Sequence, residues 1–186
     1  MPEESPLEIE AKVPLEVEDL DGVRSRLREI GARLGTPRLR EENTLFDFPD
    51  GRLEKADSAL RVRTFGRECL LTYKGRAREH AFLKLREEIE TRVEDAAALI
   101  RLLELLGLRK AFHYWKFREI YSLELPLGTV TVALDETPIG FFAEVEGPEE
   151  SIGAVVELMG WDPASFIRES YPKLYREHGL GAPGAE

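Results

Sequence analysis

Cysteine and histidine are scarce in this chain. Its 186 residues include one cysteine, Cys69, and three histidines, His80, His113 and His178. A single cysteine excludes an intramolecular disulfide and a cysteine-rich zinc site. Cys69 lies in the apolar run Cys-Leu-Leu, which is typical of a small core residue. The three scattered histidines argue against a histidine-based metal centre.

Long apolar runs and an excess of basic residues are also missing. No run approaches the ~20 apolar residues that a membrane-spanning helix needs. Residues 1–6 are acidic and lack the apolar stretch of a secretory signal. Acidic residues outnumber basic ones by 36 to 26, which gives a net charge of −10 and argues against binding to nucleic acids or anionic membranes. We therefore expect a cytoplasmic protein with neither kind of partner.

The common phosphate-binding and catalytic motifs are absent too. The sequence has no Gly-x-x-x-x-Gly-Lys-[Ser/Thr] loop, no Gly-x-Gly-x-x-Gly turn, no His-Glu-x-x-His and no Gly-x-Ser-x-Gly. If the protein handles a nucleotide or a polyphosphate, its side chains must therefore supply the contacts that a P-loop makes with main-chain N–H groups.

The chain does contain a series of strand-like segments. Its length is that of one domain. Residues 7–13 alternate between apolar and polar positions, as a half-buried strand does, and glycine or proline separates several of the later segments. The expected strands are 7–13, 39–48, 58–65, 69–74, 82–93, 108–117, 118–125, 129–134 and 141–147.

Two predicted helices occupy equivalent places in an internal repeat. The first is capped at Asp19 or Asp21 and stops at Gly31; the second has Asp95 as its N-cap and stops at Gly107. The expected buried stripe of the second helix is Leu99, Leu102, Leu103 and Leu106. Each helix follows one copy of a similar strand, residues 8–13 and 88–93. The repeat favours two pseudo-equivalent halves of one closed sheet.

Two short helices are expected to close the domain. One spans residues 152–159, and the other opens at Asp162, which is followed by proline at the first helical position. Residues 179–186 show no periodicity. We expect a flexible N-terminus over 1–5, a single domain over 6–178 and a disordered tail over 179–186.

Charged side chains gather on one face of the predicted strands. Side chains at i and i+2 share a face, so Glu8, Glu10 and Lys12 point away from the apolar residues between them. Water on that face is the ordinary explanation, but neighbouring like charges repel unless something lies between them. Seven acids and seven bases follow the pattern: Glu8, Glu10, Glu88, Glu90, Asp135, Glu144 and Glu146, and Lys12, Arg61, Arg63, Lys74, Arg86, Lys116 and Arg118. In a closed barrel these charges could line a lumen suited to a phosphate-rich anion and a divalent metal.

These residues resemble the CYTH superfamily, also called triphosphate tunnel metalloenzymes. Glu8-x-Glu10-x-Lys12 is similar to its signature. The match continues through Leu60–Arg63, Leu71–Gly75, Arg86–Glu90, Lys116–Arg118, Leu134–Glu136 and Gly140–Glu146, and covers residues 6–178. It is most similar to the branch of class IV adenylyl cyclase-like proteins and thiamine triphosphatases. The resemblance implies an α+β fold, in which an eight-stranded antiparallel closed β-barrel has helices packed outside.

The resemblance also implies a role for each charged position. Glu8, Glu10 and Lys12 would form the catalytic set. The substrate would be bound by Lys12, Arg61, Arg63, Lys74, Arg86, Lys116 and Arg118. One or two Mg²⁺ or Mn²⁺ ions would be held by Glu8, Glu10, Glu88, Glu90, Asp135, Glu144 and Glu146.

Three functions follow from such a site. The first is metal-dependent hydrolysis of a triphosphate such as ATP, inorganic triphosphate or thiamine triphosphate. The alternative is cyclisation of ATP to cyclic AMP and pyrophosphate, which requires a fixed ribose and exclusion of water. The third is a non-catalytic polyphosphate or nucleotide sensor, against which the seven acids weigh. The sequence leaves the organic leaving group and the choice between monomer and homodimer open.

Overall fold

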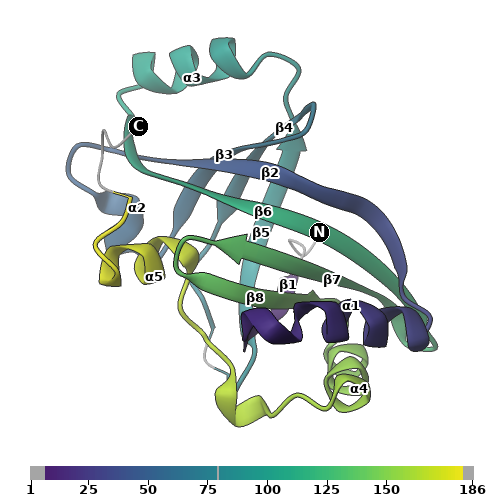
Figure 1. Cartoon of the computed structure of the whole chain (residues 1–186). Helices are drawn as coiled ribbons and strands as arrows, with labels where there is room; N and C mark the ends of the chain where they lie inside the picture. The colour runs from purple at the N-terminus through teal and green to yellow at the C-terminus, as the bar shows by residue number, and fades with distance from the viewer. Residues whose placement is uncertain (1–6, 79, 182–186) are drawn as a thin grey trace, which may run out of the picture.

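The computed structural model describes residues 7–78 and 80–181, and its centre is an eight-stranded antiparallel β-barrel (Figure 1). The strands are β1 (Leu7–Leu15), β2 (Arg33–Asp47), β3 (Ala59–Phe65), β4 (Glu68–Lys74), β5 (Lys84–Arg92), β6 (Arg109–Leu125), β7 (Gly128–Thr137) and β8 (Gly140–Glu146). They close in the order β1-β5-β4-β3-β2-β6-β7-β8, which confirms the predicted fold class. The two strands expected over 108–117 and 118–125 form one long strand, β6, because no turn residue lies between Phe117 and Arg118.

The strand order supports the expectation of two equivalent halves. If β1, β2, β3 and β4 change places with β5, β6, β7 and β8, the order of strands around the closed ring stays the same, read in the opposite direction. The halves are therefore β1–β4 and β5–β8, and strands of different halves pair at four places: β1 with β5, β4 with β5, β2 with β6 and β1 with β8. In each half a helix follows the first strand. The repeated segments 8–13 and 88–93 thus lie on neighbouring antiparallel strands.

Helices lie outside the barrel. They are α1 (Leu20–Glu29), α2 (Arg52–Lys55), α3 (Ala96–Leu105), α4 (Glu149–Met159) and α5 (Tyr171–Glu177), with short 3₁₀ turns at Val17–Asp19 and Pro163–Ser165. Asp95 caps α3 as predicted, because its carboxylate accepts a hydrogen bond of 2.9 Å from the N–H of Ala98. Gly31 and Gly107 follow the ends of α1 and α3 with φ of 92° and 89°, a conformation that favours glycine.

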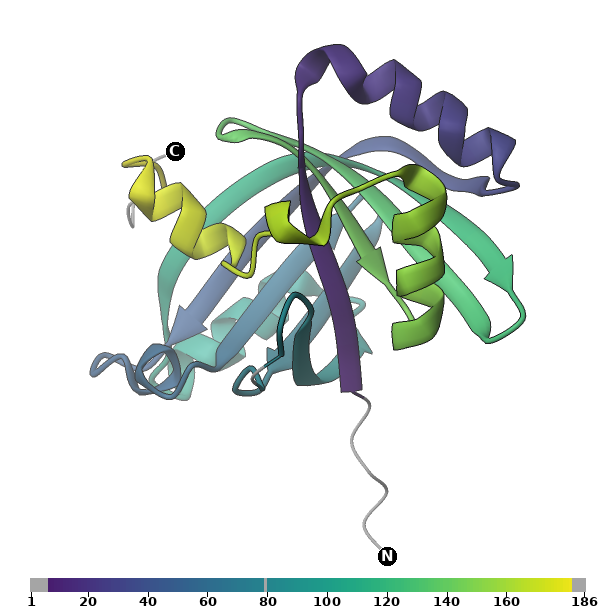
Figure 2. The same cartoon turned by 90° about the horizontal axis from the view of Figure 1, so that it is seen from below.

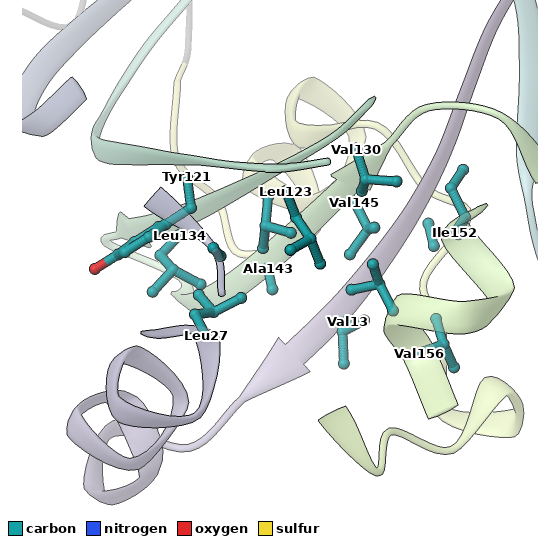
Figure 3. Packing of buried hydrophobic residues seen from close by; sticks show 14 of the residues in the cluster. Val13, Leu27, Tyr121, Leu123, Val130, Leu134, Ala143, Val145, Ile152 and Val156 are labelled. Carbon is teal, nitrogen blue, oxygen red and sulfur yellow. The ribbon is translucent and has the colours of Figure 1, made fainter. Parts of the chain in front are cut away.

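The main apolar core lies between the barrel wall and the helices α1 and α4. Figure 3 shows Val13, Val130 and Val145 of the wall meeting Leu27 of α1 and Ile152 of α4. All five side chains are buried. Burying each such side chain stabilises the fold by about 1.5–3 kcal/mol. Because the apolar face of each strand is used on this outer side, the alternating charged face turns into the lumen.

The helix α3 packs on the barrel differently from the prediction. Of the expected stripe only Leu103 is fully buried, whereas Leu102 and Leu106 are 57% and 71% exposed. The contact with Phe46 and Val62 of the barrel is made by Leu103, with Leu99 and Ile100 beside it. The prediction was wrong because leucines lie on every side of this helix, so apolar spacing alone does not select the face that packs.

The last predicted helix begins later than expected. Asp162 caps only a 3₁₀ turn, through a 2.9 Å hydrogen bond from the N–H of Ala164. The helix itself, α5, begins at Tyr171 and also has proline near its start. The described chain then continues to Gly181, and the N–H of Leu180 donates to the carbonyl of Tyr175 over 2.8 Å. The flexible N-terminus expected over 1–5 and the tail residues 182–186 lie outside the described residues.

Across the described ranges, none of the helices is long and apolar enough to span a membrane.

Candidate active site in the barrel lumen

The charged strand faces converge on one cavity of about 790 Å³ inside the barrel. Thirteen of the fourteen side chains predicted for the site line it: Glu8, Glu10, Lys12, Arg61, Arg63, Lys74, Arg86, Glu88, Glu90, Lys116, Arg118, Glu144 and Glu146. They come from six strands, β1, β3, β4, β5, β6 and β8. The alternation of charged and apolar residues therefore identified the inward positions correctly, whereas the role of each residue stays a prediction.

The charges are separated into two walls. We use "acidic wall" for Glu8, Glu10, Glu88 and Glu146, which lie on the adjacent strands β1, β5 and β8. The "basic wall" consists of Arg61, Arg63, Lys116 and Arg118, which lie on β3 and β6 on either side of β2. In the ring of eight strands β2 is four places from β1, so the two walls face each other across the lumen.

The acidic wall is crowded with carboxylates. Glu10 and Glu146 are direct cross-strand partners, and Glu8 lies near Glu88. Burial and the nearby carboxylates of Glu8, Glu88 and Glu10 raise the pKa of Glu146 to about 7, against the partial opposition of Lys74. The pKa of Glu8 is also raised, through burial and a hydrogen bond with Glu88. A cation bound here would relieve this repulsion.

Two lysines balance part of this negative charge. Lys74 contacts Glu8 at 2.7 Å and Glu88 at 2.5 Å. Lys84 lies 3.2 Å from Glu10 and also faces the cavity. Lys84 was not predicted as a site residue, although extending the alternation of Arg86, Glu88 and Glu90 by one step would have found it.

The basic wall contains a buried acid that the sequence did not reveal. Glu41 is 1% exposed and lies 3.5 Å from Lys116 and 3.9 Å from Arg63 and from Arg118. Burial opposes ionisation of Glu41, but the positive charges of Lys116, Arg118 and Arg63 hold its pKa well below the usual range. The run Arg-Glu-Glu-Asn-Thr is polar at odd and even positions alike, so it carries no alternation that could mark Glu41 as inward.

Asp135 departs from its expected role as a metal ligand. It is 1% exposed and is not among the residues that line the cavity. Its carboxylate accepts hydrogen bonds from Lys116 at 2.9 Å, from Arg118 at 2.6 Å and from the hydroxyl of Tyr171 at 2.6 Å. A metal ion would have to displace these donors. Asp135 therefore lies behind the basic wall and orients it.

Arg86 also has less freedom than predicted. Its Nε donates to the carbonyl of Gly75 at 2.9 Å, and its Nη2 donates to the carbonyl of Asp57 at 3.1 Å. These bonds tie together two loops at one end of the barrel. Because its guanidinium is engaged with main-chain oxygens, we leave Arg86 out of the proposed phosphate-binding set.

Arg61 and Arg63 retain unused hydrogen-bond donors. Arg63 donates to Glu90 at 2.9 Å, and Arg61 makes one longer bond of 3.4 Å to Thr72. The Nε atoms of both arginines are buried, and within the described chain neither has a hydrogen-bond acceptor. Burial and the adjacent charge of Arg61 lower the pKa of Arg63. Two neighbouring guanidinium groups with free donors are suited to binding a phosphate group.

The acidic wall fits a divalent metal in the type of its ligands. Carboxylate oxygens are the ligands that Mg²⁺ and Mn²⁺ prefer, and burial together with the neighbouring carboxylates raises the pKa values of Glu8 and Glu146. Among the residues with described positions, no three acidic, histidine or cysteine side chains already stand close enough to hold a metal ion together. Binding would therefore require these carboxylates to leave Lys74 and Lys84 and turn toward the ion.

A closed antiparallel barrel with facing carboxylates and basic side chains is the architecture that the resemblance to the triphosphate tunnel enzymes implies. Comparison with protein families agrees with this assignment. The model of the CYTH domain matches residues 6–158. The chain belongs to the CYTH family, whose tunnel enzymes generally depend on a divalent metal.

Several known proteins are similar to this chain over most of its length. A protein of Methanocaldococcus jannaschii named "putative adenylate cyclase" is 28% identical over 177 residues, which cover 89% of this chain and 98% of that protein. The PH1819 protein of Pyrococcus horikoshii has a structure with a TM-score of 0.71 and 29% identity, covering 92% of this chain and 99% of that one. A "putative adenylyl cyclase" of Hippeastrum, with 18% identity and a TM-score of 0.60, shares the fold over 95% of this chain and 98% of its own.

Proposed function

We propose that this protein hydrolyses a triphosphate held in the lumen, with the help of Mg²⁺ or Mn²⁺. The observation that carries the proposal is the opposition of the acidic and basic walls across one cavity of about 790 Å³. A triphosphate with its metal is an elongated ligand with negative oxygens on one side and a cation on the other. Each wall complements one side of such a ligand.

The basic wall would hold and orient the phosphates. Arg61 and Arg63 present planar guanidinium groups that can each grip two phosphate oxygens, whereas Lys116 acts as a point charge. These groups are already fixed by burial and by ion pairs, so little reorganisation is needed when charge develops on the phosphate oxygens. Lys12 contributes a further buried ammonium group, 3.3 Å from Glu144.

The acidic wall would hold the metal. In our proposal Glu8, Glu10, Glu88 and Glu146 supply its ligands, whereas Glu90 and Glu144 pair with Arg63 and Arg118 of the basic wall. A divalent ion bound there would neutralise phosphate oxygens and lower the pKa of a bound water. These carboxylates face the basic wall across the lumen, so a metal held by them would lie on the opposite side of the substrate from the arginines.

Two features favour hydrolysis over the alternatives. Cyclisation of ATP requires a fixed ribose and exclusion of water, and a cavity of this size leaves room for water beside a triphosphate. A pure anion sensor would gain affinity by losing the carboxylates of the acidic wall. The Hippeastrum protein is described as having a dominant triphosphatase activity, which gives a precedent for hydrolysis on this fold.

The proposal is tested by product analysis. The purified protein is incubated with ATP, inorganic triphosphate or thiamine triphosphate in the presence of Mg²⁺ or Mn²⁺, and cyclic AMP, pyrophosphate and phosphate are separated. Metal-dependent phosphate release supports hydrolysis. Formation of cyclic AMP with pyrophosphate as the main products would replace it with the cyclase function, and binding without any turnover would replace it with the sensor.

The matched control is a change of the same chemistry outside the lumen. Glu29 is an exposed acid on α1, paired with Arg26 at 3.2 Å. Glu29→Gln should retain full activity, so that any loss in a lumen variant can be assigned to the site.

We also expect the protein to act in the cytoplasm as a monomer or a homodimer.

A further inference from the structure

Tyr171 brings the C-terminal chain into the charged cluster of the lumen. After α4 the chain crosses β1 on its way to α5 (Figure 2). The N–H of Ile167 donates to the carbonyl of Lys12 at 2.9 Å, and the ammonium group of Lys12 donates to the carbonyl of Glu169 at 2.9 Å. The first residue of α5, Tyr171, is thereby placed at the lumen and is 4% exposed.

The ring of Tyr171 contacts two ammonium groups. The Nζ of Lys12 lies 4.2 Å from the ring centroid, and the Nζ of Lys116 lies 4.4 Å from it. Both lysines are almost fully buried, at 3% and 2% exposure. The face of an aromatic ring attracts a cation, and this attraction is strongest where water is excluded. One ring therefore holds two lysines that come from different strands.

The hydroxyl of Tyr171 reaches a third cation indirectly. It donates to Oδ2 of Asp135 at 2.6 Å, and the same carboxylate accepts two hydrogen bonds of 2.6 Å from Arg118. Burial and the charge of Asp135 raise the pKa of Tyr171 well above its ordinary value, so the hydroxyl remains a donor. Loss of this donor would leave Asp135 freer to move, and Arg118 with it.

We propose that Tyr171 is a positioning residue, which fixes Lys12, Lys116 and Arg118 in the arrangement that receives the phosphates. This inference rests on the proposed function for the identity of the ligand. Tyr171 lies beyond the part of the chain that the family model matches, residues 6–158. The C-terminal segment thus completes a site whose charged side chains come from the barrel.

The test compares two substitutions at Tyr171 with one at Tyr175. Tyr171→Phe keeps the ring and removes the hydroxyl, whereas Tyr171→Leu removes the ring as well. Tyr175 is equally buried on the same helix, but its hydroxyl donates to the main-chain carbonyl of Trp115, and no cation lies over its ring among the described residues. Tyr175→Leu therefore removes a similar amount of packing without disturbing the cations.

The kinetic constants for inorganic triphosphate with Mg²⁺ and the calorimetric affinity for inorganic triphosphate alone are measured on folded protein. We expect Tyr171→Leu to lower both kcat and affinity by about tenfold or more. Tyr171→Phe should lower kcat by about three- to tenfold and change KM by less than about twofold, since the ring still holds the lysines. Tyr175→Leu should change each value by less than about twofold.

Each outcome bears on the inference separately from the proposed function. The positioning role would be overturned if Tyr171→Leu kept the kcat and affinity of the wild type. It would also be overturned if Tyr175→Leu lowered kcat and affinity as much as Tyr171→Leu does. If Tyr171→Leu does not fold, unchanged kcat in Tyr171→Phe would overturn it. If the wild-type protein releases no phosphate from any triphosphate, the proposed function fails, and the affinity for inorganic triphosphate then decides the role of Tyr171.

Discussion

Replacing Glu41 by glutamine should destabilise the empty protein and at the same time improve its binding of triphosphate. Glu41 has Lys116 at 3.5 Å and two arginines, Arg63 and Arg118, at 3.9 Å. At these distances each pair attracts by about 4–5 kcal/mol before desolvation is subtracted, if the effective dielectric constant is about 20. Removing one partner of a buried ion pair costs about 3–5 kcal/mol in net terms, because the other charges lose their compensation.

We expect a loss near the lower end of that range. Glutamine keeps the shape of the side chain, and its carbonyl can still accept the 2.9 Å hydrogen bond that Asn43 donates to Glu41. A loss of about 3 kcal/mol corresponds to a fall in Tm of about 6–12 °C for a protein of this size. Inorganic triphosphate should then raise the Tm of Glu41→Gln more than that of the wild type, since its phosphates restore the missing negative charge.

The assay is thermal unfolding with and without inorganic triphosphate, for Glu41→Gln and for Glu42→Gln. Glu42 is the next residue of β2, on the opposite face, and its half-exposed carboxylate pairs with Arg40 at 2.6 Å. Its replacement should cost less than about 1 kcal/mol. Equal losses in the two variants, or a smaller ligand-induced shift in Glu41→Gln, would refute the assignment of Glu41 as the internal counter-charge of the basic wall.

The direction in which folding shifts the pKa of Glu41 determines how the stability difference between wild type and Glu41→Gln depends on pH. The pKa of Glu41 is lowered by folding, so its contribution is fully present above the unfolded pKa of about 4.3 and is lost as the pH falls through the folded pKa. Between about pH 5 and pH 8 the stability gap between wild type and Glu41→Gln should therefore stay constant. A gap that changes across this interval would mean that another group titrates with Glu41.

Three further predictions concern the proposed function. Glu10→Gln or Glu146→Gln should abolish metal-dependent turnover, and Glu146→Gln should leave the apo protein at least as stable as the wild type because repulsion in the acidic wall is reduced, whereas Glu10→Gln also removes the partner of Lys84; full turnover in both, measured by phosphate release, would rule them out as ligands. Inorganic triphosphate with Mg²⁺ at 100 times its Kd should stabilise the fold by about 2.7 kcal/mol, whereas monophosphate should shift the Tm far less; equal shifts would count against a site for three phosphates. Arg63→Lys should lower kcat as well as raise KM, since the planar fork is lost, while Arg26→Lys on α1 should be silent; a change in KM alone would mean that Arg63 only recruits the anion.

The sequence was most informative where charged and apolar residues alternate. In Glu8-Ile9-Glu10-Ala11-Lys12 every second residue is charged, and the structure turns these positions into the lumen. Such a pattern is local, because each strand must present one face to the apolar core under the helices. A closed ring could be inferred because the same pattern recurs in both halves of the chain.

The positions that sequence reasoning missed depend on contacts between distant segments. Asp135 follows the predicted alternation, but its carboxylate lies behind the residues that line the cavity. There it accepts a hydrogen bond from Tyr171, 36 residues later in the chain. Glu41 lies in a polar run without alternation, so only its pairing opposite Lys116 on β6 reveals its direction. The exposed face of α3 was misassigned for the same reason, since Leu102 and Leu103 are equal in the sequence and differ only in what they contact.

The ion pairs within the lumen involve the same side chains that would contact a metal–triphosphate complex. Lys74 and Lys84 lie against the acidic wall, where a divalent cation would bind, and Glu144 contacts Arg118 and Lys12 on the side where phosphates would bind. The protein's own charges thus occupy both halves of the proposed site. A complex that carries both signs can replace both sets of contacts together, whereas a bare anion or a bare cation leaves one set of displaced charges uncompensated. Metal and triphosphate should therefore bind cooperatively, each raising the affinity of the other.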